Sequence, residues 1–141
     1  MKKVLTFGTF DLFHMGHFYY LKQCREFGEH ITVIVARDVN VQRNKSRFPW
    51  EGEQTRLVKL QRSGLVDEAR LGYEDWSRHL EVLKDVQPEV ICLGYDQKAK
   101  VPEGPYQVVR IKPYKPEIYK TSLIKSSVEQ AGITPLIQPR G

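Results

Sequence analysis

The first 36 residues carry the feature that most limits how this chain can fold, namely two short apolar runs separated by one amphipathic stretch. Residues 3–7 (KVLTF) and 31–36 (ITVIVA) are apolar and rich in β-branched side chains, which is typical of buried strands. Between the runs, apolar side chains recur at helical spacing: Tyr20, Leu21, Cys24 and Phe27. Gly28 is placed to end that helix. A strand, a helix and a strand over so short a distance predict a βαβ unit with a parallel, right-handed crossover.

The same alternation of strand and helix patterns continues along the chain. We expect further helices near 51–63, 76–87 and 121–130, and further strands at 66–71, 90–93 and 107–111. Residues 39–52 are polar and basic, which indicates a mobile loop at the mouth of the site. The alternation predicts an α/β fold, a single Rossmann-like doubly wound domain with a mainly parallel sheet, over residues 1–130. Residues 131–141 hold prolines and glycines and are expected to form a C-terminal tail.

Composition and charge exclude several classes of protein. No apolar run approaches the length of a membrane span, and the N-terminus lacks the long apolar core of a signal peptide. Cys24 and Cys92 both stand in apolar settings, which favours buried thiols in a reducing compartment, so we expect a cytoplasmic protein. The net charge of +5 suits a polyanionic ligand, and a nucleotide or a nucleic acid would satisfy it equally.

The turn between the first strand and the first helix carries residues suited to phosphate. His14 and His17 are three residues apart and share one side of a helix start, where free N–H groups and the positive dipole end favour anions. Gly16 leaves no side chain between them. A single histidine at a helix start is more often a cap or a packing residue, but two histidines around a glycine favour a ligand. A metal site would need a third ligand that no His or Cys cluster supplies, so we expect phosphate contacts.

The run GTFDLFHMGH at residues 8–17 resembles the HxGH signature of the cytidylyltransferase-like nucleotidyltransferases, in its GTFDxxHxGH form. The resemblance extends from Val4 to about Glu129. Class I aminoacyl-tRNA synthetases also carry HxGH, but they are several times longer. The resemblance implies that an acceptor phosphate attacks the α-phosphorus of a nucleoside triphosphate and expels pyrophosphate, with no covalent enzyme intermediate. It also implies Mg²⁺ bound with the triphosphate, and homodimers are frequent in the family.

The resemblance implies roles for individual residues. His14, His17 and Lys45 would be catalytic. The histidines would stabilise charge around the α-phosphorus, and Lys45 would neutralise the leaving pyrophosphate or the acceptor. Asp38 and Arg56 would bind the acceptor. No metal ligand is assigned, and Asp11 is the best single candidate for Mg²⁺ but could equally cap the turn. The nucleotide would be bound by a larger set: Gly8, Thr9, Phe10, Asp11, Gly16, Asp96, Lys115, Thr121 and Ser122.

The late part of that set matches the family only in part. Lys115 stands where many members have an arginine, which can grip phosphate bidentately, as a lysine cannot. Thr121 and Ser122 would open the last helix and offer hydroxyl and N–H groups to the β- and γ-phosphates. Their other role, simple capping of that helix, is compatible with phosphate binding.

Smaller features bear on the acceptor. Residues 35–38 (VARD), 45–49 (KSRFP) and 93–97 (LGYDQ) resemble archaeal-type FAD synthases, although a cysteine pair of that subfamily is absent. The resemblance therefore favours ATP and FMN as substrates, giving FAD. Three aromatic residues are candidates to stack on the isoalloxazine ring: Trp50, Tyr95 and Tyr114.

Three alternatives to FAD synthesis remain open. The first is glycerol-3-phosphate cytidylyltransferase activity, which uses CTP and gives CDP-glycerol. The second is a sugar-phosphate adenylyltransferase. The third is a non-catalytic nucleotide- or RNA-binding module on the same fold, which the presence of both histidines disfavours. We expect no membrane partner, and we expect a nucleotide in preference to a nucleic acid.

Overall fold

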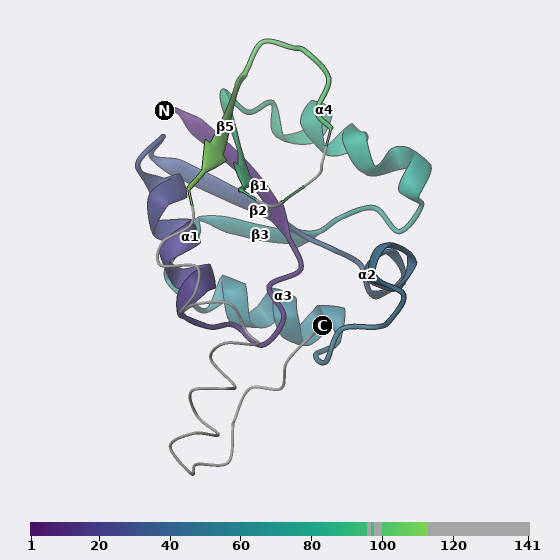
Figure 1. Cartoon of the computed structure of the whole chain (residues 1–141). Helices are drawn as coiled ribbons and strands as arrows, with labels where there is room; N and C mark the ends of the chain where they lie inside the picture. Colours follow the sequence, from purple (N-terminus) through teal and green to yellow (C-terminus); the bar gives the residue numbers. More distant parts are fainter. Residues whose placement is uncertain (96, 98–99, 113–141) are drawn as a thin grey trace.

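The computed structural model describes residues 1–95, 97 and 100–112 (Figure 1). Its strands are β1 (Lys3–Gly8), β2 (His30–Val35), β3 (Glu68–Leu71), β4 (Val90–Gly94) and β5 (Gln107–Ile111). Its helices are α1 (Met15–Arg25), α2 (Asp38–Lys45), α3 (Glu53–Gln61), the 3₁₀ helix η1 (Trp76–Glu81) and α4 (Val82–Val86). The predicted last helix and tail fall outside the described residues, as do several predicted site residues: Asp96, Tyr114, Lys115, Thr121 and Ser122.

The strands form one sheet in the order β3-β2-β1-β4-β5, and every neighbouring pair is parallel. The predicted Rossmann-like α/β fold is therefore confirmed. In the register, Gly8 lies opposite Val35, and Gly94 lies opposite Ile111, so the carboxyl ends of these strands meet at one edge. The strand order reverses between β1 and β4. Ligands of open α/β sheets bind in the crevice at such a switch point, outside the carboxyl ends of the strands.

Each strand of the sheet centre alternates its side chains between two apolar layers. One layer joins sheet residues such as Val33 to Leu21 of α1 and Leu60 of α3, and the other joins Leu5 and its neighbours to Val82 and Val86. Figure 1 accordingly shows α1 and α3 on one side of the sheet and α4 on the other. The predicted burial of both thiols is confirmed, since Cys24 and Cys92 are free cysteines in the interior.

The segment after β2 differs from the predicted loop. The prediction of a loop over 39–52 was wrong for its first part, because Asp38–Lys45 forms helix α2. Apolar periodicity is weak in this segment, and the helix is held by tertiary contacts instead. Val41 is buried, and the side-chain amide of Asn40 donates to the backbone carbonyls of Tyr73 at 3.0 Å and Glu74 at 3.2 Å.

The described helices are short, and α1 has 11 residues. Within the part of the chain that the structure describes, none combines the length and the apolar character that a transmembrane span requires.

The turn between α1 and β2 requires a glycine at position 28. A Cβ atom there would lie 2.6 Å from the carbonyl oxygen of Lys2 and 2.8 Å from Cγ2 of Val4. The same carbonyl accepts a hydrogen bond from His30 N at 3.2 Å, at the start of the β1–β2 pairing. Both distances are shorter than van der Waals contact, so a side chain at position 28 would push the two backbone segments apart.

We therefore expect Gly28→Ala to lower the free energy of unfolding by roughly 1–3 kcal/mol, the range found when a packed site is overfilled. Urea denaturation measures the change. Lys22→Ala on the exposed side of α1 is the control, and its effect should stay within about 0.5 kcal/mol. A Gly28→Ala protein as stable as the control variant would contradict this account of the turn.

Candidate active site

The motif loop runs from the end of β1 at Gly8 to the start of α1 at Met15. Phe10 and Leu12 have φ angles of 52° and 48°, in the left-handed region that residues other than glycine rarely adopt. The buried ring of Phe10 supports one of the histidines, with its centroid 5.4 Å from that of His17. Strained backbone of this kind persists only where the surrounding structure fixes it, and it is concentrated at functional sites.

The two histidines of the motif begin helix α1 through their own side chains. His14 is the N-cap residue, and its Nδ1 accepts a hydrogen bond from Gly16 N at 3.0 Å. His17 Nδ1 accepts from His14 N at 3.2 Å, which completes a capping box. The two rings are stacked with centroids 4.0 Å apart and planes inclined by 22°. The structure therefore brings together the pair that the sequence singled out.

These hydrogen bonds also decide where each imidazole carries its proton. A nitrogen that accepts a hydrogen bond from a backbone N–H cannot itself be protonated. Nδ1 of His14 and Nδ1 of His17 are both acceptors, so each neutral ring carries its proton on Nε2. Each ring thus has an Nε2–H group to donate to a ligand.

Both histidines are neutral at physiological pH. Burial lowers the pKa of His14 to about 4. Burial, and then the positive charges of His14 and Lys45, lower the pKa of His17 to about 3. The structure thus stacks His14 on His17, and the charge of Lys45 acts on His17 electrostatically.

These pKa values predict how stability changes with pH. In the unfolded chain a histidine titrates near pH 6.5, whereas His14 and His17 in the folded protein bind protons only near pH 4 and 3. Between those limits the unfolded state binds more protons, so the free energy of unfolding falls as pH is lowered from about 6.5 toward 3.

We expect urea denaturation to show a smaller loss over this range in the double variant His14→Asn/His17→Asn than in the wild type. Asparagine does not titrate, and its Oδ1 atom can accept the same backbone hydrogen bonds. Equal losses in the two proteins would show that the histidines are not held in the neutral form.

Asp11 joins the motif loop to the segment that follows α2. Its carboxylate is buried and accepts from Trp50 N at 2.8 Å and from Glu51 N at 2.9 Å. In return, Glu51 Oε1 accepts from Leu12 N at 3.0 Å, and Glu51 also pairs with Lys59. Because both oxygens of Asp11 bind backbone amides, the structure favours its capping role over metal binding. Among the described residues, no group of three or more His, Cys, Asp and Glu side chains could hold a metal ion.

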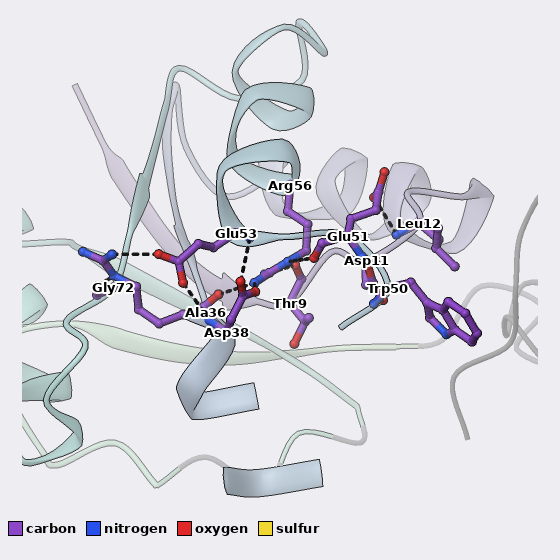
Figure 2. A network of polar contacts seen from close by, with 11 residues as sticks. Thr9, Asp11, Leu12, Ala36, Asp38, Trp50, Glu51, Glu53, Arg56 and Gly72 are labelled. Atoms are coloured by element: carbon purple, nitrogen blue, oxygen red, sulfur yellow. Dashed lines mark hydrogen bonds and ion pairs between the residues drawn. The ribbon is translucent and has the colours of Figure 1, made fainter. Parts of the chain in front are cut away.

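The hydrogen bonds between Asp11, Leu12, Trp50 and Glu51 are called the Asp11–Glu51 clamp below. Arg56 lies next to this clamp in the interior and is 0% exposed (Figure 2). Its Nε donates to Glu51 O at 3.0 Å, and its two terminal nitrogens donate to Thr9 O and Ala36 O, each at 2.8 Å. One of them also binds Asp38 Oδ1 at 2.6 Å. The predicted acceptor-binding role of Arg56 was wrong, because a side chain with no exposed surface cannot contact a substrate. Asp38 keeps 31% of its side chain exposed, and its role toward the acceptor stays a prediction.

A second pair of hydrogen bonds fastens the starts of α2 and α3 to each other. Asp38 N donates to Glu53 Oε1 at 2.8 Å, and Glu53 N donates to Asp38 Oδ2 at 3.2 Å. Arg37 adds a further link. Its Nη1 donates to Glu53 Oε2 at 2.8 Å, and its Nε donates to the carbonyl oxygen of Gly72 at 2.8 Å. Sequence reasoning missed these positioning roles of Glu51 and Glu53. An acidic residue at a helix start signals only a favourable dipole contact, and its distant partners leave no pattern in the sequence.

The other predicted nucleotide-binding residues that the structure describes lie in or beside the motif loop. Gly8 closes β1, and a Cβ atom there would lie 2.5 Å from the ring of Phe10. Thr9 gives its carbonyl to Arg56, and Gly16 gives its N–H to His14. Gln97, from the LGYDQ run, accepts from Gly94 N at 2.6 Å and donates to Phe7 O at 3.1 Å, which ties the ends of β4 and β1 together.

The Arg56 network predicts a large stability effect from a small substitution. In Arg56→Lys, one ammonium cannot reach the four oxygens that the guanidinium serves, so buried acceptors are left without donors. We expect the free energy of unfolding to fall by about 3 kcal/mol, as when a buried ion pair is disrupted.

Arg70→Lys is the matched control, because Arg70 pairs with Glu68 at the surface, and such pairs contribute about 0–1 kcal/mol. Urea denaturation of both variants gives the comparison. Equal effects of the two substitutions would refute the structural role of Arg56.

Comparison with known proteins agrees with this geometry. Residues 5–133 match the family model described as cytidylyltransferase-like. The chain belongs to the cytidylyltransferase-like family.

Among its relatives, a protein from Methanosarcina barkeri named FAD synthase is 45% identical over 98 residues, which cover 70% of this chain and 68% of the relative. A second FAD synthase, from Thermoplasma volcanium, is 32% identical over 137 residues, covering 91% of this chain and 94% of the relative. A crystal structure from Thermoplasma volcanium, of a protein named for lipopolysaccharide core biosynthesis, superimposes with a TM-score of 0.65 at 30% identity. That match covers 100% of this chain and 99% of the other.

Proposed function

We propose that the chain is an FAD synthase, an FMN adenylyltransferase. A phosphate oxygen of FMN attacks the α-phosphorus of ATP, the bond from that phosphorus to the oxygen bridging the α- and β-phosphates breaks, and pyrophosphate leaves with the bridging oxygen. The observation that carries the proposal is the pair of neutral histidines at the start of α1, whose Nδ1 atoms are held by backbone N–H groups. The names of the relatives support FMN as the acceptor.

In this proposal His14 and His17 act as hydrogen-bond donors. Negative charge on the oxygens of the α-phosphate grows and shifts during attack, and fixed N–H donors in a partly buried site stabilise it. With pKa values of about 4 and 3, the two rings hold their Nε2 protons as neutral groups at pH 7. Phosphoryl transfer of this kind depends on positioning and on charge stabilisation, without a nucleophile from the protein.

The other residues of the site bind and orient the nucleotide. Lys45 offsets phosphate charge, either that of the attacking FMN phosphate or that of the pyrophosphate as it leaves. Thr9 and Gly16 lie on the loop and helix start that face the phosphates, and Asp11 fixes that loop. The later residues of the predicted set remain proposals for nucleotide contacts: Asp96, Lys115, Thr121 and Ser122.

Mg²⁺ enters this proposal with the nucleotide. Because the described residues form no cluster that could hold the ion, we treat it as part of the MgATP substrate, where it compensates phosphate charge.

The reaction is tested by incubating the protein with Mg²⁺ and either ATP or CTP, together with FMN, glycerol 3-phosphate or a sugar 1-phosphate. We expect FAD and pyrophosphate in equal amounts from ATP and FMN, and little product from the other pairs. Formation of CDP-glycerol or of an ADP-sugar without FAD would overturn the choice of acceptor and support the corresponding alternative.

His17→Asn separates catalysis from folding in the same assay. The asparagine Oδ1 atom can still accept from His14 N and cap the helix, but no donor remains at the position of Nε2. We expect kcat to fall by about a hundredfold or more, the usual effect of removing one fixed donor. His79→Asn, on η1 outside the motif, is the control. Unchanged kcat in His17→Asn would refute the donor role of His17, whereas a wild-type protein that binds the nucleotide but releases no pyrophosphate would favour a non-catalytic binding module.

A further inference from the structure

Several exposed apolar side chains occur in the segments that follow strands β1, β2 and β4. The segments that follow the carboxyl ends of β1, β2 and β4 contain these exposed residues: Met15, Val39, Phe48, Trp50 and Tyr95. Phe48 is 63% exposed and Trp50 is 53% exposed. Phosphate groups need N–H donors and positive charge, so the triphosphate does not explain these exposed apolar side chains. A planar ring system in one of the substrates would explain it.

Trp50 is an exposed aromatic residue that the structure ties directly to the motif loop. Its backbone N–H donates to Asp11 Oδ2 at 2.8 Å. The next residue, Glu51, donates its backbone N–H to Asp11 and accepts from Leu12 N. Asp11 lies three positions before His14. In Figure 2 the indole ring lies beyond Asp11 and Leu12, on the side away from Arg56. The backbone of Trp50 is therefore held in place, while about half of its surface stays in contact with solvent.

Charge in the same stretch of chain fits the other end of FMN. Arg43 and Lys45 lie in the last turn of α2, and Lys45 acts electrostatically on His17. A phosphate bound by Lys45 would therefore lie within electrostatic reach of His17. Residues 43–50 thus offer cations for a phosphate and an aromatic ring for a flat heterocycle. Glycerol 3-phosphate and sugar phosphates have no flat aromatic ring to stack on the indole.

We propose that Trp50 is a specificity residue of the acceptor subsite, where its indole stacks on the isoalloxazine ring of FMN. This inference rests on the proposed function, since it names the subsite for that acceptor. Stacking of an aromatic side chain on a heteroaromatic ring tolerates variation in the ring but requires a flat partner. The subsite therefore selects flavin phosphates over small phosphorylated acceptors.

The test compares Trp50→Ala, Trp50→Phe and Trp76→Ala with the wild type. The chain has two tryptophans, and Trp76 stacks on His79 with ring centroids 4.1 Å apart, so Trp76→Ala controls for the loss of a surface indole. We expect Trp50→Ala to raise KM for FMN about tenfold, as for the loss of one aromatic stacking contact, and to leave KM for ATP and kcat within about twofold. Trp50→Phe should recover most of the loss, and Trp76→Ala should match the wild type.

Binding of FMN provides a second readout that does not depend on turnover. Contact with an indole quenches flavin fluorescence, so titrating FMN with protein gives both the Kd and the depth of quenching. We expect Trp50→Ala to bind about tenfold more weakly and to quench less, while urea denaturation shows the fold intact.

The outcomes separate this inference from the function on which it rests. If the wild type makes FAD but Trp50→Ala keeps the wild-type KM and quenching, the role of Trp50 is refuted and the function stands. If the wild type binds FMN and loses this binding in Trp50→Ala but makes no FAD, the stacking role stands and the function fails. A wild-type protein that neither binds FMN nor makes FAD overturns both.

Discussion

The buried guanidinium of Arg56 is the interaction on which the carboxyl edge of the sheet depends. It donates to carbonyls of the motif loop, of the residue after β2 and of the segment before α3, and it pairs with Asp38. Moving a cation out of water costs several kcal/mol, and this cost is offset only when its donors are all matched. Here the acceptors come from segments far apart in sequence, so one side chain sets how three loops lie relative to one another.

The clamp of Asp11 and Glu51 and the capping box of the histidines build on that arrangement. Asp11 and Glu51 hold the motif loop against the 50–51 backbone, which lets Phe10 and Leu12 keep their left-handed conformations. At the end of the loop, the hydrogen bonds that begin α1 also occupy Nδ1 of both histidines as acceptors. The same contacts therefore start a helix and fix the protonation of two side chains. Structure and proposed chemistry share one set of hydrogen bonds.

The fold was largely predictable from the sequence because parallel strands buried on both faces appear as continuous apolar runs, as in residues 3–7 and 31–36. Helix α2 was not predictable in this way. Its buried side chains, Asn40 and Val41, form no apolar stripe, and its contacts come from the chain near Tyr73. Tertiary contacts decided this element, and single-sequence patterns do not contain them.

The same distinction applies to the candidate site: features set by local spacing were predictable from the sequence, and features set by distant contacts were not. The short motif placed His14 and His17 correctly together, because three-residue spacing on a helix is a local property. Arg56 was misassigned to binding of the acceptor substrate, because the sequence shows its charge but does not show which protein oxygens surround it. The choice between capping and metal binding for Asp11 also depended on partners 39 and 40 residues away.

The most direct measurement of the central claim is the protonation of the two imidazole rings. Long-range ¹H–¹⁵N correlation spectra at pH 7 distinguish Nδ1–H, Nε2–H and doubly protonated histidine, and the His14→Asn and His17→Asn variants assign the signals. The account predicts that both rings are neutral and carry their proton on Nε2, as the hydrogen bonds to Nδ1 require. A proton on Nδ1 of either ring, or an imidazolium at this pH, would contradict it.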